Sequence, residues 1–87
     1  MHVVKRHGKK EKFDELKLYA SIYSAALVAG YGEQKAERLA DSICNTIKKR
    51  YSKKTITSTE LKKQTIKELK KKDKDIAFLY ETHLDLS

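Results

Sequence analysis

The sequence predicts an α+β fold, mainly helical, in which about four helices are capped by a short N-terminal β-hairpin or small sheet. Apolar residues recur at three- and four-residue steps from residue 16 onward, which is the period of an amphipathic helix. Residues 1–13 lack this period and place a glycine between two short segments, as a hairpin does. Proline is absent, so no such residue interrupts a helix.

Length and composition predict a single domain over residues 1–87. Hydrophobic residues make up 39% of the chain, which is enough to build one compact core. Cys44 is the only cysteine, so no disulfide can form within the chain and no multi-cysteine zinc site is available. No apolar run approaches the length of a membrane span. These features predict a protein of the reducing cytoplasm.

The N-terminal segment is expected to fold as a hairpin. Residues 3–6 are predicted to form a strand, Gly8 to lie in the turn, and residues 10–13 to form the return strand. Lys5 and Arg6 would point to opposite faces of an ideal strand. Both side chains could therefore reach one ligand only if the strand twists or bulges.

Two helices are predicted to follow, over residues 15–29 and 33–51. Asp14 is a good N-cap for the first helix, and Gly30 ends it. Each helix carries an apolar stripe at helical spacing. The stripes comprise Leu16, Tyr19, Ile22, Tyr23, Ala26 and Leu27 in the first helix and Ala36, Leu39, Ala40, Ile43, Ile47 and Tyr51 in the second. Cys44 lies beside the second stripe, which favours a core thiol over a nucleophile.

The rest of the chain is predicted to add a strand and two helices. Residues 55–57 are β-branched and could extend the hairpin into a small sheet. The segment TSTE at 57–60 predicts a helix start, because its first threonine and its glutamate have capping-box spacing and its serine can also cap. The run KKKDKD at 70–75 is expected to be a solvated connection, after which Asp73 or Asp75 can cap a last helix. The apolar positions are Leu61, Thr65, Ile66 and Leu69 in the third helix and Ile76, Ala77, Leu79, Tyr80, His83 and Leu84 in the last.

Several familiar kinds of site are absent from the sequence. The three glycines fit neither a P-loop nor a dinucleotide fingerprint. The three histidines form no H-x-x-x-H pair, and one cysteine supports no convincing metal constellation. No Ser/His/Asp set can be argued from the sequence. We therefore expect that the protein is not an enzyme.

The charge of the chain favours anionic partners. Lys and Arg number 20 against 12 acidic residues, which gives a net charge of +8. Nucleotides, nucleic acids and acidic surfaces all fit such a charge, as does a merely lysine-rich soluble surface. A small basic nucleic-acid-binding protein is the alternative function, since the five tyrosines could offer stacking surfaces. Most of these tyrosines, however, stand at core-like helical spacings.

The opening stretch VVKRHGKKEKFDELKL, residues 3–18, resembles the start of an ATP-cone domain. This family is the regulatory nucleotide-binding module of ribonucleotide reductases and of the repressor of reductase genes. Its pattern is an apolar residue, KRDG, a glutamate, an FD pair and then K-I. The segments ITSTEL at 56–61 and DIAFLY at 75–80 are similar to the family's third and closing helices, so the resemblance covers essentially the whole chain.

The resemblance implies a site for ATP or dATP, with or without Mg²⁺, between the hairpin, the first helix and the start of the third helix. Lys5 and Arg6 would hold the triphosphate, and their side chains suit this role as a point charge and a fork of donors. The third helix would present its N-terminus, a natural anion site. The other residues implied at this part of the pocket are Lys17, Ser58, Leu61 and Lys62.

The same resemblance implies how the adenine would be held. Val3 and Phe13 would sandwich the base, while Glu11 and Asp14 would accept hydrogen bonds from its amino group. Val3 and Phe13 also suit a hairpin that packs on the first helix, and Asp14 suits an N-cap whether or not adenine is bound. Nucleotide binding would alter association with a second copy or with a partner such as a ribonucleotide reductase or a transcriptional regulator.

Two positions depart from the family pattern. His7 stands where the family usually has aspartate, in the turn of the hairpin. The chain ends ETHLDLS, with Asp85 where many members continue with arginine or lysine that can reach phosphate. We expect a local effect at the turn and fewer triphosphate contacts from the C-terminal end.

Overall fold

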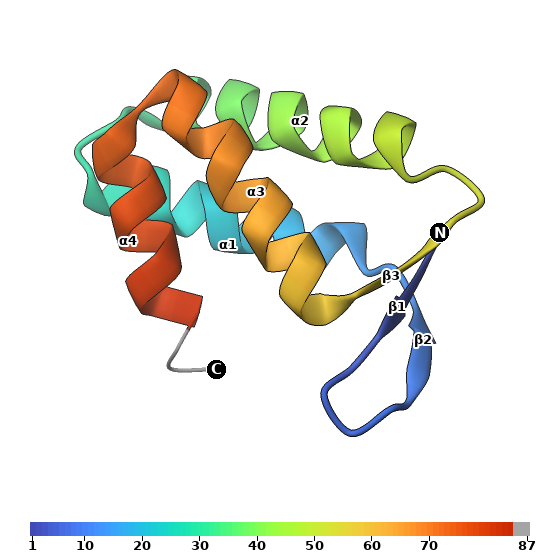
Figure 1. The fold of residues 1–87 in the computed structure, drawn as a ribbon. Coiled ribbons are helices and arrows are strands. Elements are labelled where there is room, and N and C mark those ends of the chain that lie inside the picture. The colour runs from blue at the N-terminus through green and yellow to red at the C-terminus, as the bar shows by residue number, and fades with distance from the viewer. Residues whose placement is uncertain (85–87) are drawn as a thin grey trace.

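The computed structural model describes residues 1–84, which form four helices and a three-stranded sheet (Figure 1). The predicted α+β class is confirmed, and the third strand does join the hairpin. Among the described residues, no helix is long and apolar enough to cross a membrane. The elements are β1 (His2–Val4), β2 (Lys10–Lys12), α1 (Glu15–Val28), α2 (Glu33–Arg50), β3 (Thr55–Thr57), α3 (Ser58–Lys72) and α4 (Lys74–Leu84).

The sheet has the order β2-β1-β3, with β1 at its centre. Strand β1 pairs antiparallel with β2 and parallel with β3, so that Val3 lies opposite Glu11 on one side and Ile56 on the other. A parallel pair needs a long crossover connection, and here α1 and α2 supply it. The sheet therefore brings the N-terminal hairpin directly beside the start of α3 (Figure 1).

The first strand is shorter than predicted, because the turn begins earlier. β1 ends at Val4, and Lys5 already belongs to the turn: its N–H donates to the Lys9 carbonyl and its carbonyl accepts from the Gly8 N–H, both at 2.8 Å. Gly8 has a φ of 86°, which L side chains rarely adopt. The expectation that Lys5 and Arg6 occupy opposite faces of a strand was wrong, because neither residue lies in the strand.

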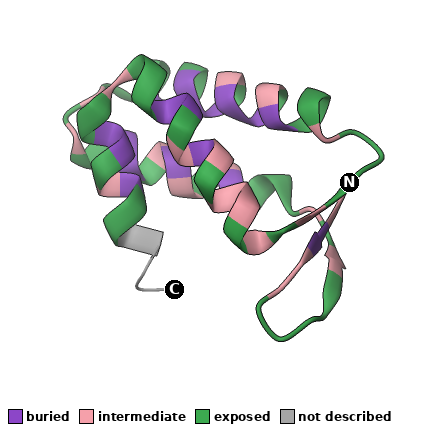
Figure 2. Ribbon diagram, in the orientation of Figure 1, coloured by how far each residue is buried: buried purple, intermediate pink, exposed green. Residues whose placement is uncertain are grey.

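Helices α1 and α2 end one residue before the predicted limits and pack together around most of the hydrophobic core. Figure 2 shows the buried segments of all four helices turned toward one another. Cys44 is 1% exposed, and burial raises the pKa of its thiol to about 11, which confirms the core position. The largest fully buried aliphatic side chains are Ile22, Ile43, Ile47, Leu69 and Ile76.

The apolar stripe of α1 is phased differently from the prediction. Leu16, which was expected in the core, is 80% exposed, whereas Leu18 is only 6% exposed. Ile22 follows Leu18 by four residues and lies on the same helical face, while Leu16 lies about half a turn away. Leu27 is 39% exposed, so it too lies at the edge of the packed face.

Helix α3 extends further than the sequence indicated. The run at 70–75 was predicted to be a connection, but α3 continues through Lys72 and only Asp73 separates it from α4. Lysine is a good helix former, and cations in the last turn stabilise the helix dipole. Asp73 caps α4 by accepting from the N–H groups of Asp75 and Ile76, and it also accepts a 2.8 Å hydrogen bond from the Tyr31 hydroxyl. The side chains of His83 and Leu84, predicted on the apolar face of α4, lie outside the described residues.

Two leucines of α1 provide a matched test of this packing. Leu18→Ala is expected to lower the free energy of unfolding by about 2–5 kcal/mol, because it removes buried methyl groups and leaves a cavity. Leu16→Ala is expected to change it by less than about 0.5 kcal/mol, because the side chain faces solvent. Urea denaturation of both variants measures these values, and equal losses would contradict the observed phase of the helix.

Candidate functional site

An open groove of about 800 Å³ lies between the hairpin, the first turns of α1 and the first turns of α3. All ten residues that the resemblance placed around a nucleotide line this groove. Val3, Lys5 and Arg6 come from β1 and the turn, and Glu11 comes from β2. The others come from the segment between β2 and α1, from the first turn of α1 and from the start of α3. They are Phe13, Asp14, Lys17, Ser58, Leu61 and Lys62.

The groove has further lining residues that were not expected at a nucleotide site from the sequence. His7 and Lys12 lie within the hairpin motif and could have been found there. Ser21 follows Lys17 by four residues, so helical spacing also pointed to it. Tyr80 comes from α4, and no local signal in the sequence relates it to the hairpin. Leu18 and Thr59, each next to a predicted residue, complete the lining.

His2 does not line this groove. It lines a smaller hollow of about 350 Å³, together with Lys12, Phe13 and Lys48 among others. Asp85, where many family members have a cation, lies outside the described residues.

Positive charge dominates the groove. Five of its lining side chains are cationic (Lys5, Arg6, Lys12, Lys17 and Lys62), whereas Glu11 and Asp14 are its two carboxylates. Lys5 Nζ lies 3.8 Å from Glu11 Oε2, and both side chains are partly exposed. This pair is too long and too solvated to hold either group firmly. The groove thus offers cations and apolar surface together, which suits a ligand that carries both phosphate and an aromatic base.

Two helix starts face the groove, and each is capped from its own segment. Asp14 Oδ1 accepts a 3.1 Å hydrogen bond from the Lys17 N–H at the start of α1, as predicted. At α3 the cap is Thr57, whose hydroxyl accepts from the Glu60 N–H at 3.0 Å, so Ser58 is the first helical residue. Helix geometry leaves the first N–H groups of α3 without partners inside the helix, and such groups attract anions.

A family model described as the ATP cone domain matches residues 1–80. The chain belongs to the ATP-cone family. ATP-cone domains are regulatory modules that bind adenine nucleotides, so the family assignment agrees with the cationic and apolar groove. A comparison with curated proteins found no match.

The ATP-cone groove offers nucleotide chemistry but no metal cage of its own. Among residues 1–84, no group of three or more His, Cys, Asp or Glu side chains could hold a metal ion. Magnesium typically binds through substrate phosphates and one or two carboxylates, with water completing its shell. Glu11 and Asp14 are the carboxylates within the groove.

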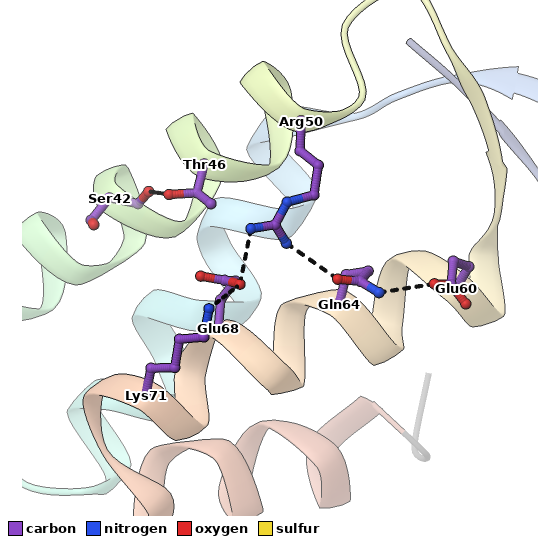
Figure 3. Close-up of polar contacts among 7 residues, drawn as sticks. All are labelled: Ser42, Thr46, Arg50, Glu60, Gln64, Glu68 and Lys71. Carbon is purple, nitrogen blue, oxygen red and sulfur yellow. Dashed lines mark hydrogen bonds and ion pairs between the residues drawn. The ribbon is translucent and has the colours of Figure 1, made fainter.

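A line of polar contacts holds α3 against the end of α2 (Figure 3). Gln64 Nε2 donates to Glu60 Oε1 at 2.9 Å, and Arg50 Nη1 donates to Gln64 Oε1 at 3.2 Å. Glu68 Oε2 then lies 3.1 Å from Arg50 Nη2 and 3.2 Å from Lys71 Nζ. Burial raises the pKa of Glu68, but the hydrogen bonds from Lys71 and Arg50 outweigh it and lower the pKa overall. The contacts fix the position of α3, whose first turn lines the groove.

Arg50→Ala tests this line of contacts. We expect it to lower the free energy of unfolding by about 1 kcal/mol near neutral pH, because Glu68 loses a charged partner that is itself partly exposed. The folded-state pKa of Glu68 is lowered, so its contribution is present above the ordinary value of 4.5 and is lost as pH falls through the folded-state pKa. Urea unfolding at neutral and acidic pH should therefore show the difference from wild type shrinking on acidification. Lys49→Ala, which removes an exposed neighbouring charge, should show no such difference.

Proposed function

We propose that the protein senses adenine nucleotides: the groove binds ATP or dATP, and binding alters how the domain associates with itself or with a partner. The observation that carries this proposal is the convergence of all ten expected residues on one groove of about 800 Å³. Seven of them lie within residues 3–17 and the other three at the start of α3, so the groove joins two stretches that are distant in the sequence. The volume also lies within the range of small-molecule and cofactor pockets.

Phosphate would bind at the turn and at the first turn of α3. Lys5 and Arg6 share one tight turn, which brings a point charge and a guanidinium fork to the same edge of the groove. Ser58 lines the same groove at the N-terminus of α3, where backbone N–H groups are available to an anion. Lys5 would exchange its weak 3.8 Å contact with Glu11 for a phosphate oxygen.

Adenine would bind at the apolar end. Val3 is 4% exposed and Phe13 is half-buried, so the base would rest mainly on Phe13, with only a small accessible part of Val3 beside it. Glu11 Oε2 faces Lys5 and Asp14 Oδ1 caps α1, which leaves the second oxygen of each carboxylate for the adenine amino group. Guanine carries a carbonyl oxygen at that position, and two carboxylates would repel it.

The response of the domain would follow from linkage. A nucleotide that binds one assembly better than another shifts the population toward the assembly it prefers. Within the proposal, the partner is a second copy, a ribonucleotide reductase or a transcriptional regulator. The protein would work in the cytoplasm, where ATP and dATP occur, and as a regulator rather than an enzyme.

Thermal unfolding with ATP, dATP, GTP or no nucleotide tests nucleotide choice. At about a hundred times its dissociation constant, a ligand stabilises the fold by about 2.7 kcal/mol, a shift that is easily seen in a domain of this size. We expect the unfolding temperature to rise with ATP and dATP but not with GTP. This difference should persist when the salt concentration is raised. Equal shifts with every nucleotide that vanish as salt rises would point instead to nonspecific binding of phosphate, as in a nucleic-acid-binding protein.

Removing the two cations of the turn tests the phosphate end. Lys5→Ala/Arg6→Ala should abolish ATP binding while leaving the unfolding temperature without nucleotide nearly unchanged, because both side chains are at least partly exposed. Lys9→Ala/Lys10→Ala is the matched control: it removes the same charge from the same hairpin, at positions that do not line the groove. Calorimetric titration with ATP measures both variants, and equal affinities would contradict the assignment of the phosphate site.

A further inference from the structure

We propose that His7 is a further phosphate-binding residue of the groove, and that its protonation makes nucleotide affinity rise as pH falls. The inference rests on the proposed function, because it assumes that the groove holds a polyphosphate. It adds a residue and a form of regulation that the family pattern does not contain, since the family usually has an acidic side chain at this position.

The turn presents His7 beside the expected phosphate-binding residues. The Gly8 N–H donates to the Lys5 carbonyl at 2.8 Å, so Arg6 and His7 are the two central residues of one tight turn. Both side chains are exposed, and both line the groove together with Lys5. A phosphate bound at this edge of the groove would therefore have both residues among its neighbours. An imidazole in this place can donate one hydrogen bond when neutral and two when protonated.

The charges around His7 link protonation of its imidazole to the binding of phosphate in the groove. Besides Lys5 and Arg6 on its own turn, the groove that His7 faces carries Lys12, Lys17 and Lys62 from β2, α1 and α3. A bound triphosphate reverses the local sign and favours the imidazolium. The other titratable groups of the groove are Glu11, Asp14 and Tyr80, and burial keeps the Tyr80 phenol neutral by raising its pKa to about 12.

Linkage then fixes the sign of the effect. If phosphate favours the protonated imidazole, protonation must favour phosphate by the same factor. An unperturbed histidine side chain changes its charge between about pH 5 and pH 8, which is the range that a test should cover. Nucleotide binding should accordingly take up protons from solution, and it should strengthen on acidification.

Calorimetric titration of the full chain with ATP, at about pH 6 and about pH 8, tests the inference. Each titration is repeated in two buffers of different ionisation enthalpy, which gives the number of protons taken up. At the lower pH, wild type should bind ATP about two- to fivefold more tightly than His7→Asn does. This difference is typical of charge pairs at exposed positions. The titration of ATP itself is common to both proteins and cancels in this comparison.

Two further variants separate charge from structure. His7→Lys carries a permanent charge, so at both pH values it should restore the ATP affinity lost in His7→Asn, and without the proton uptake assigned to His7. A purely structural role for the turn would not produce this rescue. His2→Asn removes another histidine, one that lies outside the groove, and should keep the wild-type pH profile.

The outcomes are distinguishable. Identical pH profiles and proton uptake in wild type and His7→Asn would overturn the role of His7 while leaving the ATP site in place. Absence of ATP binding by the folded wild-type chain at both pH values would overturn the proposed function, and this inference with it. If His7→Asn takes up fewer protons than wild type on binding ATP, and His7→Lys restores the affinity, the result would support both the ATP site and the role of His7.

Discussion

The groove depends on one backbone constraint, the parallel pairing of β1 with β3. Val3 in β1 lies opposite Ile56 in β3, although more than half of the chain separates the two residues. Because parallel strands cannot be joined by a tight turn, the chain between them must make a long crossover, and α1 and α2 form it. The same pairing sets the hairpin beside the first turn of α3. Without it, the turn cations and the N-terminus of α3 would have no fixed relation to each other.

The remaining interactions hold the walls of the groove in place. Asp14 fixes the first turn of α1 and Thr57 fixes that of α3, each through a hydrogen bond within its own segment. Packing of α1 against α2 then buries Ile22, Ile43 and Ile47, which makes the back of the domain rigid. The contacts from Arg50 to Glu68 and Gln64 add a polar link between α2 and α3 (Figure 3). A small core thus supports a site built mainly from short and exposed segments.

Charge distribution suits a ligand-dependent regulator. The groove holds five cationic side chains and two carboxylates, so without a ligand its cations repel one another. A bound polyphosphate would relieve this repulsion. Any change in self-association or partner binding would have to begin with such a difference between the empty and the occupied groove.

Sequence alone determined the features that depend on local chemistry. Asp14 and the TSTE segment identified two helix starts, Gly8 identified the turn, and the spacing around Ile43 identified the buried face of α2. Tertiary structure decided what depends on distant contacts. Leu16 fits an apolar stripe by spacing, yet it is exposed because α2 packs on the face that carries Leu18. Tyr80 reaches the groove only because α4 folds back on α1 and α3, an arrangement that no short-range pattern encodes.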